Sequence, residues 1–137
     1  MSFLLDTNVV SELRRRTADE HVVRWAAAID RRQAFVSVVT VREIEAGVLL
    51  TERRDAHQGA LLRSWLDEQI LIGYADRLLP VDLTVARRAA ALHVSDPRPE
   101  RDALIAATAL VHGLTVATRN VSDFEPTGVP VVNPWEA

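Results

Sequence analysis

Four carboxylates that are far apart in this sequence each lie beside an apolar segment, where they could bind a metal ion. They are Asp6, Glu43, Asp102 and Asp123. A carboxylate beside apolar residues costs free energy unless a positive group offsets its desolvation. If the fold brings all four together, their mutual repulsion requires a cation, and ligation by oxygen alone favours Mg²⁺ or Mn²⁺. The pattern therefore indicates a metal-dependent hydrolase that acts on phosphodiesters.

Three of these acids, taken singly, have simpler structural interpretations. Asp6 follows an apolar segment and could cap the next helix, although Thr7 could also do so. Asp102 lies near a predicted helix start, where the helix dipole stabilises a carboxylate. Asp123 could shape the turn that begins at Asn120. The chemical interpretation therefore depends on the residues meeting at one place.

Glu43 has two interpretations that the local sequence leaves open. Thr40 and Glu43 match a capping box, in which the glutamate would bond to backbone at the start of a helix. If the helix begins nearer Ser37, Glu43 lies one turn further in and can point toward a metal ion. Glu45 should face about 200° away from it, at ~100° per residue, so we interpret Glu45 as a surface acid.

Short apolar segments alternate with longer amphipathic ones, which predicts strands alternating with helices. The predicted strands are residues 3–5, 34–36, 78–81, 114–117 and 129–132. The predicted helices are residues 8–15, 38–53, 56–72, 84–94 and 100–112, with one more after residues 17–20. This order is typical of an α/β fold with a parallel sheet, in which ligands bind beyond the carboxyl ends of the strands. Asp6 follows the first strand, and Asn120 and Asp123 follow the fourth, so the acids can share that rim.

Several residues predict where the helices begin and end. Residues 17–20 match a capping box. Thr84 can cap the helix that follows it, and Pro99 can open the helix at residues 100–112. Gly113 is expected to end that helix.

Length and composition predict a single domain over residues 1–137. Apolar residues make up 48% of the chain and charged residues 26%, which is enough apolar content for a packed core. The N-terminal residues lack the basic region of a signal peptide, and no segment approaches the ~20 apolar residues of a membrane span. The absence of cysteine excludes disulfides and thiolate metal sites. We expect a soluble, cytoplasmic protein.

The formal net charge of −3 weighs mildly against nucleic-acid binding, but without the four carboxylates the charge would be +1. All 16 basic residues are arginine. Arginine suits phosphate recognition, and the absence of lysine excludes a P-loop and weighs against an aspartyl-phosphate receiver. Arg14, Arg15 and Arg16 follow Asp6 closely, so they could contact RNA at the rim or simply form a solvated helix end.

Four segments of the chain resemble PIN-domain ribonucleases, and more closely the VapC-type toxins of VapBC toxin–antitoxin pairs in the FitB-like subgroup. The matching segments are residues 5–14, 42–47, 101–109 and 118–124. Each is a weak signal alone, but their order and spacing cover almost the whole chain. The resemblance implies a PIN-like three-layer α/β/α sandwich around a mostly parallel five-stranded sheet.

The resemblance also implies a function and a set of site residues. It places the metal-binding and catalytic carboxylates on Asp6, Glu43, Asp102 and Asp123, which favours the metal site for Glu43. The implied supporting polar residues are Asn8, Thr118 and Asn120. Many PIN domains have an acid where this chain has Asn120, so Asp123 would supply the last carboxylate.

The resemblance further implies that the protein is an Mg²⁺- or Mn²⁺-dependent endoribonuclease that acts as a toxin. It would form a homodimer, assemble into a larger complex with a VapB-type antitoxin, and contact DNA only through that antitoxin. The alternative is a catalytically weak PIN-fold binding module that acts mainly through the antitoxin–DNA complex.

Overall fold

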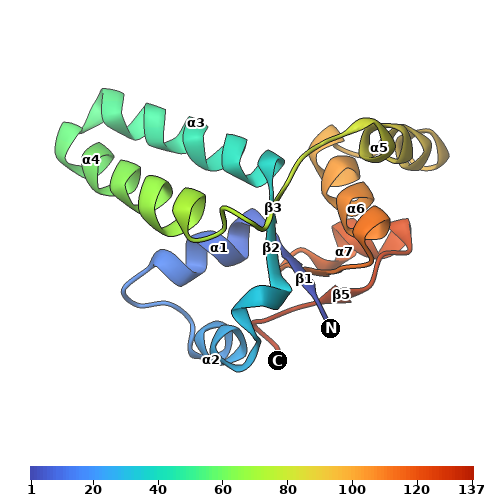
Figure 1. The fold of residues 1–137 in the computed structure, drawn as a ribbon, viewed down its shortest axis with the longest axis horizontal. Helices are drawn as coiled ribbons and strands as arrows, with labels where there is room; N and C mark the ends of the chain where they lie inside the picture. The colour runs from blue at the N-terminus through green and yellow to red at the C-terminus, as the bar shows by residue number, and fades with distance from the viewer.

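A five-stranded parallel sheet forms the centre of the protein in the computed structural model, which describes residues 1–137 (Figure 1). The strands are β1 (Phe3–Leu5), β2 (Ala34–Ser37), β3 (Leu78–Leu79), β4 (Thr115–Ala117) and β5 (Val131–Val132). They lie in the order β3-β2-β1-β4-β5, and every neighbouring pair is parallel. The predicted α/β class and the five strands are confirmed, although the predicted strands at residues 78–81 and 129–132 are only two residues long.

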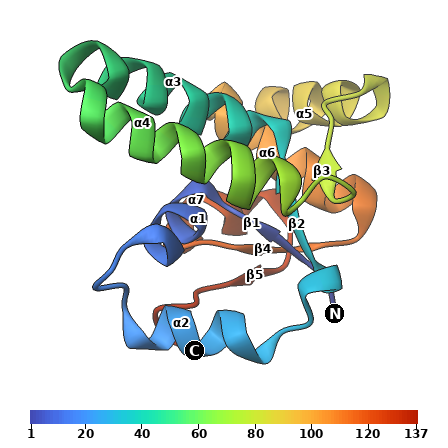
Figure 2. The ribbon, with the colours of Figure 1, turned by 60° about the vertical axis from the view of Figure 1, so that its left-hand side comes forward.

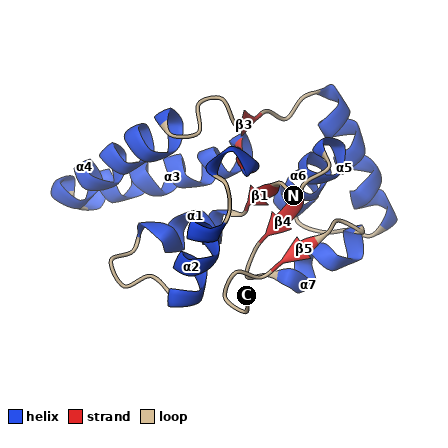
Figure 3. Cartoon of the chain, turned by 60° about the horizontal axis from the view of Figure 1, so that its bottom comes forward, coloured by secondary structure: helices blue, strands red, loops and turns tan.

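Helices cover both faces of this sheet. The α-helices are α1 (Thr7–Arg14), α2 (Glu20–Ala28), α3 (Val38–Arg54), α4 (Ala56–Ser64), α5 (Leu83–Ser95), α6 (Glu100–His112) and α7 (Val121–Phe124). Two short 3₁₀ turns, η1 (Arg31–Gln33) and η3 (Glu125–Thr127), and a π-helical segment, η2 (Trp65–Ile72), complete the chain. In Figure 3, α1 to α4 lie on one side of the strands and α5 to α7 on the other.

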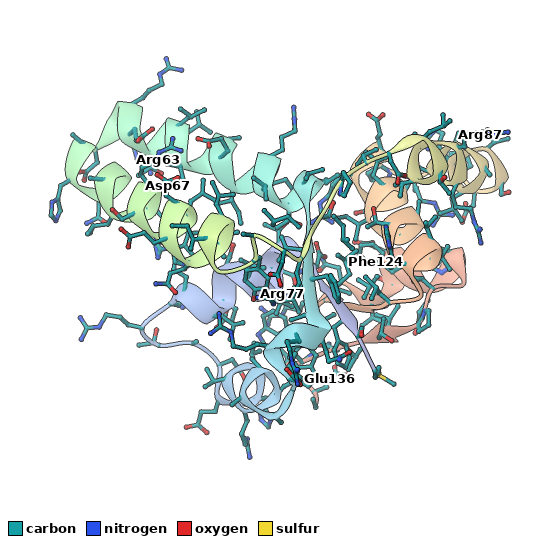
Figure 4. The ribbon with its side chains drawn as sticks, in the orientation of Figure 1. Arg63, Asp67, Arg77, Arg87, Phe124 and Glu136 are labelled. Atoms are coloured by element: carbon teal, nitrogen blue, oxygen red, sulfur yellow. The ribbon has the colours of Figure 1, made fainter.

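Alternate residues of β1 show why the sheet is buried on both faces. Phe3 and Leu5 belong to an apolar cluster with residues of α1, α2, α3 and η2. Leu4 points the other way, into a cluster with Ile105 of α6 and Phe124 of α7. Side chains alternate across a strand, so three consecutive apolar residues serve both cores. Figure 4 shows Phe124 close to α6 on its side of the sheet.

Helices α3 and α4 form a hairpin that extends beyond the sheet, as Figure 2 shows. The sequence predicted one helix over residues 56–72, and the structure divides it into α4 and η2 without a break in direction. Gly59 of α4 is buried, and a Cβ built on it would lie 2.6 Å from Cα of Glu52 in α3. The close approach of the two helices therefore requires glycine at this position.

Two predicted helix caps are wrong, and an aspartate replaces a threonine in both. The cap of α2 is Asp19, whose carboxylate accepts from the backbone N–H of His21 at 2.8 Å, so the capping box at residues 17–20 does not form. The cap of α5 is Asp82 rather than Thr84, and it accepts from Val85 N–H at 2.9 Å. In both cases the helix begins at a different residue from the predicted one, and the aspartate directly before that start accepts from an N–H of its first turn.

The predictions for α6 are confirmed at both ends. Pro99 occupies the cap position before Glu100. Gly113 follows His112 with φ of +67°, a left-handed conformation that favours glycine. None of the helices combines the length and the apolar composition required to cross a membrane.

Candidate active site

Asp6 lies at the carboxyl end of β1, completely buried, as the cap residue of α1. Its backbone N–H donates to Ala117 O of β4 at 2.9 Å, which ties it to the centre of the sheet. One carboxylate oxygen, Oδ1, accepts from Thr7 N–H at 2.8 Å, and the other, Oδ2, accepts from the Thr118 hydroxyl at 2.7 Å. The side chain is thus both a helix cap and a fixed carboxylate at the predicted rim.

Glu43 lies in the second turn of α3, because that helix begins directly at the end of β2. The cap of α3 is Ser37, whose hydroxyl accepts from Val39 N–H at 3.0 Å. The capping box with Thr40 is therefore excluded, and Glu43 points toward Asp6. Its Oε1 accepts from the Thr7 hydroxyl at 2.5 Å.

Asp102 is buried in the first turn of α6. The residue before it, Arg101, extends its guanidinium among three carboxylates. Arg101 Nη1 donates to Asp102 Oδ1 at 3.0 Å. Nε and Nη2 donate to Glu43 at 2.8 Å and 3.0 Å, and Nη2 also pairs with Asp6 Oδ1. One guanidinium therefore connects the acid at the end of β1 with acids of α3 and α6.

The ion pairs change the pKa values of the groups that form them. Burial alone would raise the pKa of Glu43, but hydrogen bonds from Arg101 and Thr7 outweigh it and leave that pKa below its ordinary value. Burial alone would lower the pKa of Arg101, and its bonds to Glu43, Asp6 and Asp102 raise it instead. All these contacts favour the charged forms.

The net charge and the carboxylate oxygens of this cluster fit a divalent cation. The three carboxylates carry three negative charges and Arg101 carries one positive charge, so the cluster has a net charge of −2. Hard oxygen ligands of this kind suit Mg²⁺ or Mn²⁺. The acids do not stand in the arrangement of a ready metal site, because their oxygens surround the guanidinium. A metal ion shared by all three would therefore require Arg101 to withdraw.

Two of the three predicted supporting residues contact Asp6 through their side chains. Thr118 donates to it directly, and Asn8 Nδ2 lies 3.3 Å from Thr118 Oγ1 and 3.5 Å from Asp6 Oδ2. Asn120 contributes through its backbone N–H, which donates to Thr118 Oγ1 at 3.0 Å. Asn8 also accepts from Arg119 N–H at 3.3 Å, so the loop after β4 is tied to α1.

Asp123 is exposed in the first turn of α7. Its backbone N–H donates to Asn120 O at 3.1 Å, and the segment predicted to be a turn is the start of this short helix. Its carboxylate does not pair with Arg101, the group that joins the other three acids. Three of the four predicted carboxylates thus form one bonded cluster, and the participation of Asp123 stays a prediction.

A groove of about 410 Å³ adjoins Glu43. Arg14 and Arg15 line it together with Thr7 and Trp65. The Arg14 guanidinium lies 5.7 Å from the centre of the Trp65 ring, and Arg15 pairs with Glu12 at 3.2 Å. Arg16 is exposed and does not line the groove. Two of the three predicted arginines are therefore beside the candidate site.

The sequence interpretation missed the roles of Arg101 and Thr7. Thr7 is not the cap of α1; its hydroxyl bonds Glu43 and lies 3.1 Å from Thr40 Oγ1. The sequence does contain a signal for the role of Arg101, which is its position at a helix start, directly before Asp102. An arginine there opposes the favourable helix dipole, which indicates that it has acidic partners elsewhere.

The fold and the carboxylate cluster agree with a sequence comparison. The profile of the PIN domain matches residues 3–125. This chain belongs to the PIN-domain family.

Several proteins are similar to this chain over nearly its full length, and they show which members of the family it resembles. The plasmid stability protein StbB of Pseudomonas syringae pv. tomato is 40% identical, over 98% of this chain and 99% of its own. The VapC ribonuclease Y4jK of Sinorhizobium fredii is 36% identical, over 97% of each. The toxin FitB of Neisseria gonorrhoeae is 38% identical, over 96% and 97%. The predicted resemblance to VapC-type, FitB-like proteins is confirmed.

Solved structures give the same assignment. The crystal structure of FitAcB from Neisseria gonorrhoeae matches with a TM-score of 0.91 and 36% identity, over 98% of this chain and 99% of that one. The structure of FitAB bound to an IR36 DNA fragment matches with a TM-score of 0.88 and 36% identity, over 97% and 95%. The three-layer arrangement is thus shared with proteins of this subgroup.

Proposed function

We propose that this protein is a divalent-metal-dependent endoribonuclease that acts as the toxin of a type II toxin–antitoxin pair. The observation that carries the proposal is the meeting of Asp6, Glu43 and Asp102 at the carboxyl end of the sheet, with two negative charges left after pairing with Arg101. The names of the similar proteins, a VapC ribonuclease and the toxin FitB, support the reaction and the role.

In this proposal Mg²⁺ or Mn²⁺ is held by Asp6, Glu43 and Asp102, with Asp123 as a further acid. The metal would lower the pKa of a bound water and stabilise charge on the phosphate. Thr7 and Thr118 hold Glu43 and Asp6 through their hydroxyls, which limits how far either carboxylate has to move when a metal replaces Arg101. Arg14 and Arg15 beside the groove are placed to hold flanking phosphates of RNA.

The partners are proposed from the relatives. The FitAcB and FitAB structures, the second with DNA, support a complex with a VapB-type antitoxin and contact with DNA through that antitoxin. A homodimer and a cytoplasmic location complete the proposal, in keeping with the resemblance to VapC-type toxins.

The test is cleavage of a mixed RNA pool by protein freed of antitoxin. We expect cleavage with Mg²⁺ or Mn²⁺ and none after chelation. Asp6→Asn and Glu43→Gln should each lower the rate by about 100-fold or more, because a bound metal contributes several kcal/mol to such a reaction. Glu45→Gln is the matched control, since Glu45 lies on the same helix but pairs with Arg63 at 2.6 Å.

Circular dichroism and melting curves must show that the variants remain folded. Asp6→Asn protein that cleaves as fast as the parent would contradict the proposal. Equal losses in Glu45→Gln would show that the assay reports stability rather than chemistry.

One observation favours the alternative, a PIN-fold binding module with little catalysis. Arg101 fills the position that the three carboxylates share, which is an arrangement stable without metal. If antitoxin-free protein cleaves no RNA with any divalent ion yet still binds its antitoxin, the binding module becomes the preferred function.

A further inference from the structure

We infer that Arg101 is an internal counter-ion that competes with the metal for the position between Asp6, Glu43 and Asp102. The inference rests on the proposed function, because it concerns how that same site is loaded. In the metal-free chain the guanidinium neutralises part of the acidic cluster. For metal to bind, the side chain has to withdraw.

The guanidinium is surrounded by carboxylates in the way that a bound metal ion would be, and it differs in this from an arginine in a simple surface ion pair. Three of its nitrogens donate to three different carboxylates, and Nη2 also lies 3.2 Å from the Thr7 hydroxyl. These partners are Asp6 between β1 and α1, Thr7 in α1, Glu43 in α3 and Asp102 in α6. A single cation thus links all three acids of the cluster.

Burial explains why a cation is needed in the absence of metal. The Asp6 side chain is 0% exposed and that of Asp102 is 11% exposed. Buried carboxylates without a positive partner are strongly destabilising. The chain itself provides that partner, so the cluster can fold before any metal arrives.

The guanidinium is also able to leave. Its side chain is 28% exposed and is attached to the first turn of α6, and three flexible methylenes separate it from the backbone. Only the molecules in which Arg101 has withdrawn can then bind metal. The apparent metal affinity is the intrinsic affinity multiplied by the fraction of such molecules. Removing the guanidinium should therefore tighten metal binding while it weakens the metal-free fold.

Isothermal titration with Mn²⁺ alone, at one fixed neutral pH, tests this without any RNA. For Arg101→Gln we expect the Kd for Mn²⁺ to fall by about tenfold or more. We also expect its melting temperature in chelator to fall by about 5–10 °C, because unpaired carboxylates remain buried. Mn²⁺ should then raise the melting temperature more in the variant than in the parent.

Arg63→Gln is the matched control. Arg63 also bridges two glutamates, Glu45 at 2.6 Å and Glu52 at 3.1 Å. It lies between α3 and α4 (Figure 4) and pairs with none of the three acids of the site. Its loss should leave the Kd for Mn²⁺ unchanged. If Arg63→Gln tightens Mn²⁺ binding as much as Arg101→Gln, the effect is one of general charge and the inference is wrong.

Arg101→Lys covers the case in which Arg101→Gln does not fold. A lysine keeps the positive charge but has one nitrogen in place of three, so this variant should fold and bind Mn²⁺ more tightly than the parent. Equal or weaker Mn²⁺ binding by either folded Arg101 variant overturns the inference.

The two hypotheses can fail separately. If the parent cleaves RNA with metal but the Arg101 variants bind Mn²⁺ no better, only the inference fails. If neither parent nor variants bind Mn²⁺, the proposed metal-dependent function fails, and the inference fails with it.

Discussion

At the scale of single residues, the site depends on hydrogen bonds that hold charged groups in place. Asp6 and Glu43 each accept from a threonine hydroxyl as well as from Arg101. Charge-assisted bonds of this kind are stronger than neutral ones and fix the geometry of both partners. The carboxylates are therefore held in fixed positions around Arg101 in the metal-free protein.

The lowered pKa of Glu43 predicts how stability depends on pH. A carboxylate whose pKa is lower in the folded chain stabilises the fold above its unfolded pKa, ordinarily 4.5. That contribution is lost as the pH falls from there through the folded value. The free energy of unfolding of the parent should thus exceed that of Glu43→Gln most at neutral pH.

The measurement is urea unfolding of metal-free parent and Glu43→Gln protein at several pH values. The difference between them should shrink below pH of about 4.5. A difference that stays constant from neutral pH to acid would show that the charge of Glu43 does not contribute.

At the scale of elements, the short strands position the site and the hairpin of α3 and α4 extends its wall. Helix α3 starts without a loop after β2, so the direction of Glu43 follows from the strand. The other half of the hairpin, α4, packs on α3 so closely that Gly59 lies against the Glu52 backbone. The hairpin must therefore keep its spacing to keep the groove beside Glu43.

Gly59→Ala should destabilise the protein by about 1–3 kcal/mol, because its Cβ would overlap the backbone of α3. The control is Gly47→Ala, also in this hairpin, where a Cβ meets nothing within 4 Å. That change should stabilise by roughly 0.5–1 kcal/mol through helix propensity alone. Thermal or urea unfolding measures both, and destabilisation by Gly47→Ala of the same size would contradict the packing argument.

At the scale of the whole molecule, the formal net charge is −3, and the cluster of Asp6, Glu43, Asp102 and Arg101 carries a net charge of −2. A divalent ion bound at the cluster would change the formal net charge from −3 to −1 and cancel the local negative charge that repels a polyanion. Metal binding, folding stability and RNA binding are thus coupled through one group of charges.

Added Mn²⁺ should accordingly raise the melting temperature of the parent. A ligand that binds only the folded state at about 100 times its Kd adds about 2.7 kcal/mol. Potassium chloride at matched ionic strength is the control and should give a much smaller shift. No difference between the two salts at millimolar Mn²⁺ would argue against a metal site.

The sequence alone was sufficient for features that depend on neighbouring residues. Alternation of apolar segments predicted all five strands, and Pro99 and Gly113 marked the ends of α6, because backbone geometry at such residues is local. The spacing of the acids, read with the family resemblance, identified Asp6, Glu43 and Asp102. The predicted caps were wrong because α2 and α5 begin at other residues than predicted, directly after Asp19 and Asp82.

Only the tertiary structure decided which charges meet. The pairing of Arg101 with Asp6 joins residues 95 positions apart, and that with Glu43 joins residues 58 apart. No local pattern encodes such distances, because they follow from the order β3-β2-β1-β4-β5 and the placement of α6 beside it. The exposure of Asp123 has the same origin: one short helix after β4 turns its carboxylate to solvent, while the other acids face a common cation.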